Sequence, residues 1–547
     1  MTFPRASGVL LHPTSLPGPH GCGDFGPAAF HFVDWLVAAK QKLWQILPLG
    51  GIGPGNSPYM SSSAFAGNLL LIDLAELAQR GWLTDTELLP DERFRETRVD
   101  FSAVVPWRMA RLEQAAARFL QTAVQPPSPA SAAGRAEQAA QASQANQTNL
   151  ADQVNQTNQT NQTNQANQAN QANQADFAAF CDQQADWLGD YALFMALAEH
   201  HDWRDWCDWP APLARRDPQA LRKARQEHAQ RIAFWKFSQW CFFRQWTKLR
   251  AYANERGIKI VGDAPIFIAY QSAEVWARQE LFELDDAGRA TVVAGVPPDF
   301  FSATGQRWGN PLYRWSAHAA EGYAWWIARM RRTTQLVDIV RIDHFRGFAA
   351  YWEIPASEPN AIRGRWLPGP GAALFEAIEA ALGALPVIAE DLGVITPDVT
   401  ALREEFGLPG MRILQFAFGE GAADDNLNTY LPHNFDHNTV VYTGTHDNNT
   451  TLGWWADAPP AMRREVLDYL GSSDGSDMHW QLIRAACASV ADTAIHPLQD
   501  VLGLGGEHRM NLPGKDQSYW EWRFTWVQVA PEHAQRLARF ARLYRRE

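Results

Sequence analysis

The chain is poor in cysteine and lacks concentrated positive charge, and each absence argues against a class of function. Its 547 residues include five cysteines, which are scattered and show no CxxC spacing. This pattern argues against a disulfide framework and against a zinc site. No Lys- or Arg-rich run occurs and the formal net charge is -12, so we expect neither nucleic acid nor an anionic membrane as a partner.

Long apolar runs and phosphate-binding loops are also missing. No stretch approaches the length of a membrane span, and the first residues, MTFPRASGVLLHPTS, hold too short an apolar run for a signal peptide. The glycine-rich run GGIGPG at 50–55 is not followed by GKS or GKT, and Pro54 lacks the N–H that a phosphate loop would use. We therefore expect a cytoplasmic protein.

Short runs rich in Val, Ile and Leu recur between segments of helical periodicity. They lie at 8–11, 43–47, 258–263, 336–343, 386–391, 411–418 and 439–447. Strands that alternate with helices predict a parallel α/β sheet, and apolar residues on both strand faces fit a sheet covered on both sides. We predict one α/β domain over 1–547, a (β/α)8 TIM barrel, with a substrate-loop insertion at 285–320.

A low-complexity tract interrupts this pattern. Residues 126–175 pass from PPSPASAAG into tandem NQT and NQA triplets, which have almost nothing to bury. We predict a disordered insertion there, because such a tract cannot repay its ordering entropy through a core. It lies within a largely helical inserted subdomain expected over 75–256. This region also carries Trp203, Trp206 and Trp209, spaced three apart, which we interpret as packing residues rather than a sugar platform.

Three runs in the second half each place a carboxylate just after a strand-like stretch. They are VRIDHFRG with Asp343, PVIAEDLG with Glu390 and VVYTGTHDN with Asp447. Cleavage of a glycosidic bond with retention needs a carboxylate nucleophile and a carboxylic acid proton donor, and a third carboxylate can stabilise the distorted sugar. Asp263, in IKIVGDAPIFIA, is a fourth acid of this kind. Because strand ends meet at the catalytic face of a barrel, we expect these acids to converge.

Each motif has another interpretation when it is taken alone. Arg341 and Asp343 share one strand face, where the guanidinium would keep the carboxylate ionised, yet a buried structural pair fits equally well. Glu390 and Asp391 leave an extended strand on opposite faces, so one of them faces the site, and such a pair often caps a helix or forms a salt bridge.

Two loops add groups suited to sugar binding. One is GNSPYMSSSAFAGN with Tyr59, and the other is VPPDFFSATGQRWGNPLY with Asp299, Gln306, Trp308 and Asn310. Aromatic planes pack on the apolar face of a glucose ring, and polar side chains bind its hydroxyls. The run HDNN, which begins at His446, also resembles a metal-ligand fragment, but no second cluster of ligand spacing accompanies it. We expect no metal and no cofactor.

These strings resemble the amylomaltases, or 4-α-glucanotransferases, of the α-amylase superfamily. The resemblance runs in family order over nearly the whole chain, from LHPTSLPGPHGCGDFG at 11–26, through the motifs above and GMRILQFAF, to RMNLPG at 509–514. It implies that Asp343 is the nucleophile, Glu390 the acid/base and Asp447 the transition-state stabiliser, with Asp263 in support. The residues it implies as sugar contacts are Arg341, His344, His446, Tyr59, Asp299, Gln306, Trp308 and Phe416.

The resemblance implies transfer of a segment of an α-1,4-glucan to the 4-hydroxyl of another glucan or of glucose. The expected partners are maltooligosaccharides and amylose-like glucans, and the sequence does not predict an oligomeric state. A retaining α-glucan hydrolase is the alternative, because carboxylate motifs do not report whether water or sugar accepts the glucosyl group. A barrel that binds glucan without cleaving it is a further alternative, and the presence of all three acids speaks against it.

Overall fold

Eight short parallel strands form the centre of the computed structural model, which describes residues 3–124, 168–298, 302–419, 428–514 and 519–547. In barrel order the strands are β1 (Ala6–Leu10), β2 (Leu43–Gln45), β3 (Lys259–Pro265), β6 (Ile339–Asp343), β9 (Val387–Ala389), β10 (Gly410–Ile413), β11 (Thr439–Tyr442) and β12 (Thr493–Pro497). The ring closes between β9 and β10, where the Ala389 amide donates to the Pro409 carbonyl at 2.9 Å. The predicted α/β barrel is confirmed.

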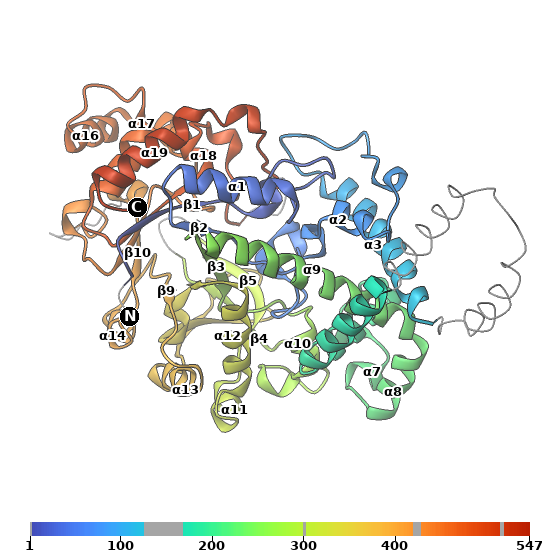
Figure 1. The fold of residues 1–547 in the computed structure, drawn as a ribbon. Coiled ribbons are helices and arrows are strands. Elements are labelled where there is room, and N and C mark those ends of the chain that lie inside the picture. Colours follow the sequence, from blue (N-terminus) through green and yellow to red (C-terminus); the bar gives the residue numbers. More distant parts are fainter. Residues whose placement is uncertain (1–2, 125–167, 299–301, 420–427, 515–518) are drawn as a thin grey trace, which may run out of the picture.

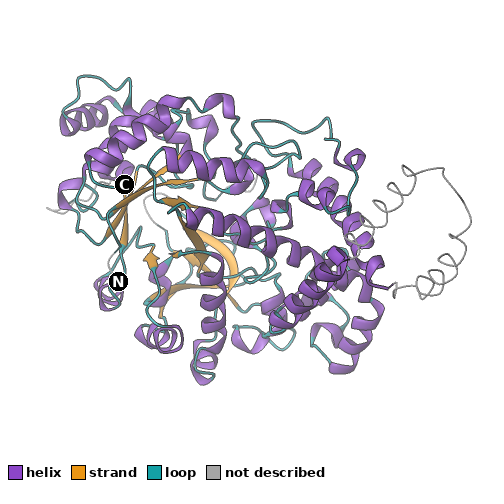
Figure 2. Ribbon diagram, in the orientation of Figure 1, coloured by secondary structure: helices purple, strands orange, loops and turns teal. Residues whose placement is uncertain are grey.

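Helices surround these strands, as Figure 1 and Figure 2 show. The principal outer helices are α1 (Pro27–Ala38), α9 (Ala229–Glu255), α12 (Ala324–Leu336), α13 (Ala372–Leu382), α14 (Pro397–Glu405), α17 (Met478–Ala488) and α19 (Pro531–Leu543). The strands are apolar on both faces because one face lines the barrel interior and the other packs under these helices. All five residues of β1 and all five of β12 are buried accordingly.

Two of the predicted runs are strand only in their first part, and one strand was not predicted. The run 411–418 is strand only to Ile413, and its LQFA portion forms a 3-10 helix, η9 (Leu414–Ala417). The run 439–447 leaves the strand after Tyr442. The eighth strand, β12, has the sequence TAIHP, whose short length and polar residues hide it from a hydrophobicity pattern.

A second, antiparallel sheet stands beside the barrel and includes the predicted 285–320 insertion. Its order is β5 (Gln306–Pro311), β4 (Val292–Val296), β7 (Ala350–Pro355) and β8 (Arg365–Pro368). Two separate excursions of the chain build it, one before β6 and one after it. The sheet therefore places β5 near the loop that leaves the barrel after Asp343.

The region 75–256 is largely helical in its described part. It contains most of α2 (Leu74–Gln79), then α3 (Phe101–Val124), α6 (Leu188–His200), α7 (Ala211–Ala214), α8 (Pro218–Glu227) and α9. α6 and α3 pack on α9, which is long enough to serve both the subdomain and the barrel. Of the three spaced tryptophans, Trp206 and Trp209 are buried and Trp203 is exposed. The packing interpretation therefore holds for two of the three.

The structure corrects the C-terminal end of the predicted disordered tract. Residues 126–167 of that tract lie outside the described residues, whereas 168–183 form a helix. Within this helix the Asn173 side chain accepts from Arg80 at 2.8 Å, and the Gln174 amide donates to the Phe119 carbonyl at 2.9 Å. The last triplets are ordered because they extend a helix whose following turns, with Phe177 and Phe180, pack against the hydrophobic core.

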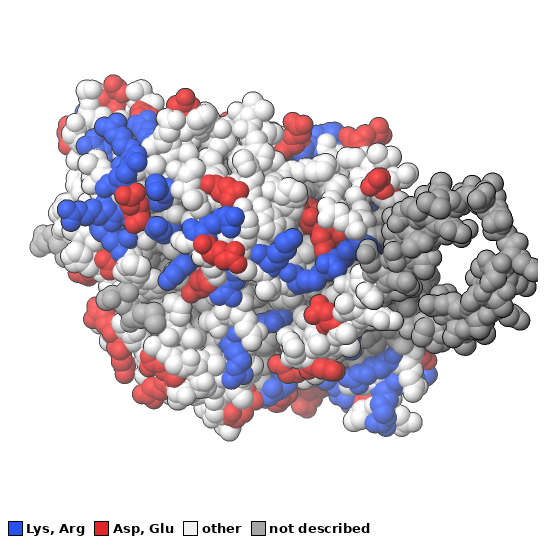
Figure 3. Space-filling model, viewed as in Figure 1, with Lys and Arg blue, Asp and Glu red and all other residues white. Residues whose placement is uncertain are grey.

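Two surface observations bear on partners. Among the described residues, none of the helices combines the length and apolar character that a membrane crossing requires. On the face drawn in Figure 3, basic side chains lie among acidic ones.

Candidate active site

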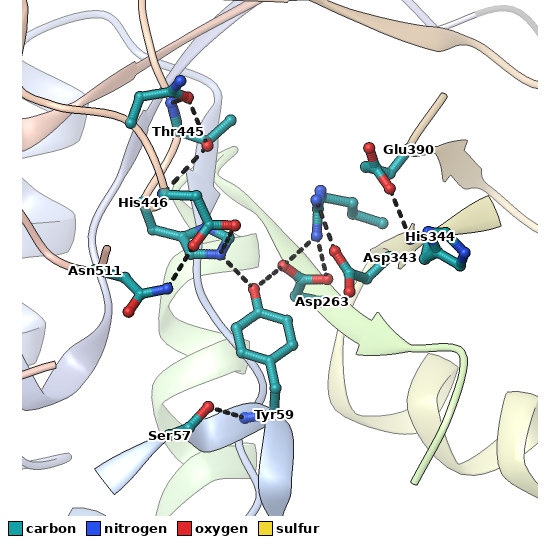
Figure 4. Close-up of polar contacts among 12 residues, drawn as sticks. Ser57, Tyr59, Asp263, Asp343, His344, Glu390, Thr445, His446 and Asn511 are labelled. Carbon is teal, nitrogen blue, oxygen red and sulfur yellow. Dashed lines mark hydrogen bonds and ion pairs between the residues drawn. The ribbon is translucent and has the colours of Figure 1, made fainter. Parts of the chain in front are cut away.

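The predicted acids meet at the C-terminal end of the barrel strands. Asp343 is the last residue of β6, Glu390 follows β9 directly, and Asp447 lies in the loop after β11. Register explains the first two, because Pro265 pairs with Asp343 in the β3–β6 ladder and the Glu390 amide continues the β6–β9 ladder by donating to the Ile342 carbonyl at 3.0 Å. Figure 4 shows the labelled residues Asp263, Asp343 and Glu390 on adjacent barrel strands.

Arg341 links two of the carboxylates. Its Nη1 lies 2.7 Å from both carboxylate oxygens of Asp263, and its Nη2 lies 3.0 Å from Asp343 Oδ1. Burial raises the pKa of Asp343 above its usual value, and the guanidinium opposes this shift. The sequence predicts a lowered pKa for Asp343 because only the guanidinium is visible there, whereas the enclosed site adds the larger desolvation effect.

Glu390 is held by two backbone amides. Its Oε2 accepts from His344 N at 2.7 Å, and its Oε1 accepts from Leu392 N at 3.0 Å. The backbone of His344 is left-handed, with φ of 53°, and in this conformation its amide donates to Glu390. Burial and the neighbouring charge of Asp343 raise the pKa of Glu390 to about 8. The side chain is therefore mostly protonated at neutral pH, as a proton donor must be.

Asp391 is the acid of this pair that faces away. Its Oδ1 accepts from Met411 N at 2.6 Å, and its Oδ2 lies 3.4 Å from both Arg403 Nε and Arg412 Nη1. These partners belong to β10 and α14 on the outer side of the barrel. The structure thus resolves the alternative left open by the ED sequence, with Glu390 in the site and Asp391 in a buried ion pair.

Asp447 is surrounded by groups that favour its ionised form. The Asn511 amide donates to Oδ1 at 2.7 Å, and His446 Nε2 lies 3.3 Å from Oδ2. Although burial acts to raise the pKa of Asp447, the His446 ring and the Asn511 hydrogen bond lower it to about 2. Burial also acts to lower the pKa of His446, but Asp447 reverses this effect and raises it above the usual value. Each member of the pair therefore favours the charged form of the other.

Tyr59 connects the two sides of the site. Its hydroxyl donates to Asp263 Oδ2 at 2.7 Å and lies 3.0 Å from His446 Nε2, and its ring stacks on the His446 ring with centroids 5.3 Å apart. Figure 4 shows Tyr59 between these two residues. Burial and Asp263 raise the pKa of the Tyr59 hydroxyl, so the phenol stays protonated and can donate.

The second sheet supplies an aromatic wall. Trp308 on β5 packs edge-on against His344 with centroids 4.8 Å apart, and its indole N–H donates to Gln306 Oε1 at 3.1 Å. Phe416, in η9, packs edge-on against Tyr430.

Two other predicted sugar contacts do not belong to this aromatic wall. Asn310 is buried, and its amide donates to the Ile268 carbonyl at 2.9 Å; its contact with sugar stays a prediction. Asp299 lies outside the described residues.

Two further residues contact the candidate site but were not singled out from the sequence. Asn511 contacts Asp447, and Trp520 lies with its ring 5.7 Å from His446 and 5.8 Å from Tyr59. Both come from the loop after β12, which returns over the barrel mouth, and the Arg509 guanidinium donates to the Asp447 carbonyl from the same loop at 2.8 Å. The RMNLPG string was the available signal, but no strand end marks its place.

Possible metal ligands gather elsewhere. Within the described part of the chain, one group of three candidate ligands is close enough to hold an ion: Asp205, Cys207 and Asp208 in the helical region. Asp208 already forms an ion pair with Arg289.

Comparisons with known proteins agree with this geometry. A family model described as 4-α-glucanotransferase matches residues 11–155 and 132–528. The chain is 47% identical to the 4-α-glucanotransferase of Thermus thermophilus, covering 99% of each chain, and 42% identical to the chloroplastic/amyloplastic 4-α-glucanotransferase of Solanum tuberosum, covering 95% of this chain and 82% of that one. Among solved structures it resembles the amylomaltase of Streptococcus agalactiae in complex with acarbose, with 34% identity, TM-score 0.86 and 99% coverage of both chains.

Proposed function

The chain belongs to the 4-α-glucanotransferase family. From its α-glucan transferase activity we propose a retaining double displacement carried by Asp343 and Glu390. We further propose maltooligosaccharides and amylose-like α-1,4-glucans as its donors and acceptors. The observation that carries the mechanism is the pairing of a carboxylate held by Arg341 with a neighbouring carboxylic acid whose pKa is raised to about 8. Two neighbouring carboxyl groups, one paired with a guanidinium and the other mostly protonated at neutral pH, are suited to opposite roles.

In the first step an Asp343 carboxylate oxygen attacks the anomeric carbon of the donor sugar. The bond from that carbon to the glycosidic oxygen breaks, and the Glu390 proton moves to the leaving oxygen. The product is a β-linked glucosyl ester of Asp343 and a shortened glucan. Asp447, held ionised by His446 and Asn511, stabilises positive charge that develops on the sugar ring in the transition state.

In the second step Glu390 acts as a base. It takes the proton from the 4-hydroxyl of an acceptor glucan, whose oxygen attacks the anomeric carbon while the bond to Asp343 breaks. Arg341 contacts Asp343 at 3.0 Å, so it stabilises the carboxylate that departs. Trp308 and Phe416 offer apolar surfaces for neighbouring sugar rings.

Product analysis separates transfer from hydrolysis. Incubation with maltotriose should yield glucose together with longer oligosaccharides. A steady rise in reducing ends without longer chains would identify a hydrolase instead. Measurable binding of maltooligosaccharide without turnover would identify a binding protein.

The assigned roles are tested by substitution. Asp343→Ala should reduce transfer by several orders of magnitude while the thermal unfolding temperature changes little, and near-normal activity would remove Asp343 as the nucleophile. Glu390→Gln should be similarly inactive, whereas the adjacent Asp391→Asn, which alters a buried ion pair outside the site, should keep kcat within about tenfold. Equal losses in these two variants would contradict the assignment of the inward-facing acid.

A further inference from the structure

A small cavity of mixed apolar and polar lining lies beside the loop that carries Asp447. It has a volume of about 20 Å3, and its walls include His12 and Ser15 after β1, Asn449 after β11, and Trp522 near the C-terminus. The loops at 445–450 and 509–510 also line it. Three segments far apart in the sequence thus meet at one point beside the catalytic loop.

Four of the residues that line the cavity carry a buried polar atom that the described residues leave without a partner. His12 Nδ1, Ser15 Oγ, Asn449 Oδ1 and Trp522 Nε1 are all buried and have no hydrogen-bond partner among the described residues. A buried polar atom of this kind destabilises the folded state unless it is hydrogen-bonded. Four such atoms around one cavity are uncommon in a native protein, in which nearly all buried polar groups are paired.

The volume and the donors suit water. A cavity needs a volume of roughly 10–15 Å3 to hold one water, which then makes about three hydrogen bonds. Trp522 Nε1 can only donate, Asn449 Oδ1 can only accept, and Ser15 Oγ can do either. Burial and the charge of His446 lower the pKa of His12 to about 3, so its ring stays neutral and offers one donor and one acceptor nitrogen.

The turn that presents Asp447 lies against the cavity. Its own hydrogen bonds run from Thr445 N and Oγ1 to Asn448 Oδ1, each 2.8 Å long, and Asn511 holds the Asp447 carboxylate. Thr445, His446, Asn448 and Asn449 of this turn line the cavity. A bridge from the β1 loop to this turn would fix the turn against the barrel.

We propose that the cavity is a structural hydration site, occupied by one or two ordered waters, and that His12 is a positioning residue that orients Asp447 through them. This inference rests on the proposed function, because it takes Asp447 as the group that stabilises the transition state. Displacement of a catalytic group by about 1 Å can cost about 100-fold in rate. The role of His12 is therefore visible in kcat rather than in substrate binding.

The kinetic test compares substitutions at His12. His12→Leu keeps a similar shape but removes both ring nitrogens, whereas His12→Asn keeps a polar nitrogen near the position of Nδ1. For maltotriose disproportionation, His12→Leu should lower kcat about 10- to 100-fold with KM within about threefold of wild type. His12→Asn should recover kcat to within about fivefold of wild type.

A matched control separates positioning from stability. His318 in α11 (Trp315–Ala320) is also fully buried and without hydrogen-bond partners among the described residues, but it does not line the cavity. His318→Leu should leave kcat within about twofold of wild type, whatever its effect on the unfolding temperature. A wild-type kcat in His12→Leu, or no recovery in His12→Asn, would overturn the positioning role.

A crystal structure of the wild-type protein at high resolution tests the hydration site directly. We expect ordered water within hydrogen-bond distance of His12 Nδ1 and of at least one of Ser15 Oγ and Asn449 Oδ1. A cavity without ordered water would overturn the proposal. This measurement does not depend on catalysis, so it stands even if product analysis shows hydrolysis instead of transfer.

Discussion

The protonation state of Glu390 makes a quantitative prediction about alkaline pH. Its pKa lies near 8, against an ordinary value of 4.5, because burial and the adjacent Asp343 charge disfavour its ionised form. In the proposed mechanism, glycosyl transfer to Asp343 requires the protonated form. That form makes up about nine-tenths of the enzyme at pH 7, half at pH 8 and about one-tenth at pH 9.

The experiment therefore varies the pH at low maltotriose concentration. We expect kcat/KM to be nearly constant around pH 6–7 and to fall about tenfold per pH unit above pH 8, because kcat/KM reports ionisation of the free enzyme. Initial rates of glucose release at constant ionic strength measure this profile. A limb centred near pH 5, the value expected for an exposed carboxyl group, would refute the argument from burial and neighbouring charge.

A donor with a fluoride leaving group is the matched control. Fluoride departs without a proton, so kcat/KM for an α-maltosyl fluoride should show no alkaline limb at pH 8. For the same reason, Glu390→Gln should keep most of its kcat/KM for this donor although it loses maltotriose turnover. If the limb persists with the fluoride donor, another group causes it and Glu390 is not the titrating acid.

Protein stability should follow the same ionisation with a definite sign. The folded state holds the Glu390 proton more tightly than the unfolded chain does, so its contribution to stability is present below pH 4.5 and is lost as pH rises from about 4.5 to 8. The Glu390→Gln side chain does not ionise, so the variant does not lose this stability as pH rises. The unfolding temperature of the variant relative to wild type should therefore rise across that interval, and a constant difference would contradict the raised pKa.

Three further predictions concern other parts of the molecule. Asn511→Ala removes a hydrogen bond to the charged Asp447, worth about 1.5–3 kcal/mol, and should lower kcat about 10- to 150-fold; an unchanged kcat in a folded variant would contradict its role. Deletion of 126–167 should leave kcat and unfolding temperature nearly unchanged, whereas extending the deletion through 174 should lower the unfolding temperature because helical contacts are lost; equal temperatures for the two deletions would argue against that anchor. Arg546→Ala should cost about 3 kcal/mol or more in thermal or urea unfolding, because this buried side chain donates to carbonyls around the end of α17, while exposed Arg545→Ala should cost little.

The barrel could be predicted because each of its strands carries its own short hydrophobic pattern in the sequence. A run such as IVRID alternates between Arg341 and Asp343 on one face and apolar residues on the other, and seven of the eight strands could be located from runs of this kind. β12 escaped because TAIHP is buried by the tertiary fold without being strongly apolar in composition. The last NQA triplets were misassigned for a related reason, since their order depends on the helix that continues beyond them.

Part of the site could also be predicted from local sequence. Asp343 and Glu390 follow strands directly, so their positions at the barrel mouth could be inferred from sequence alone. Asn511 and Trp520 reach the site from a long loop after β12, and no periodicity indicates where such a loop returns. The sequence also could not show that the amide of Asn310 satisfies a buried backbone carbonyl, because that partner, Ile268, lies in another loop.

The sequence by itself determined which acids are available and which end of the barrel carries them, because side-chain direction and strand order follow from short-range periodicity. The tertiary structure alone decided their chemical states. Glu390 is an acid near neutral pH because Asp343 and the surrounding protein exclude water from it, and Asp447 stays ionised because His446 and Asn511 surround it. Burial and charge proximity depend on distances between segments well separated in the sequence, and only the folded chain sets those distances.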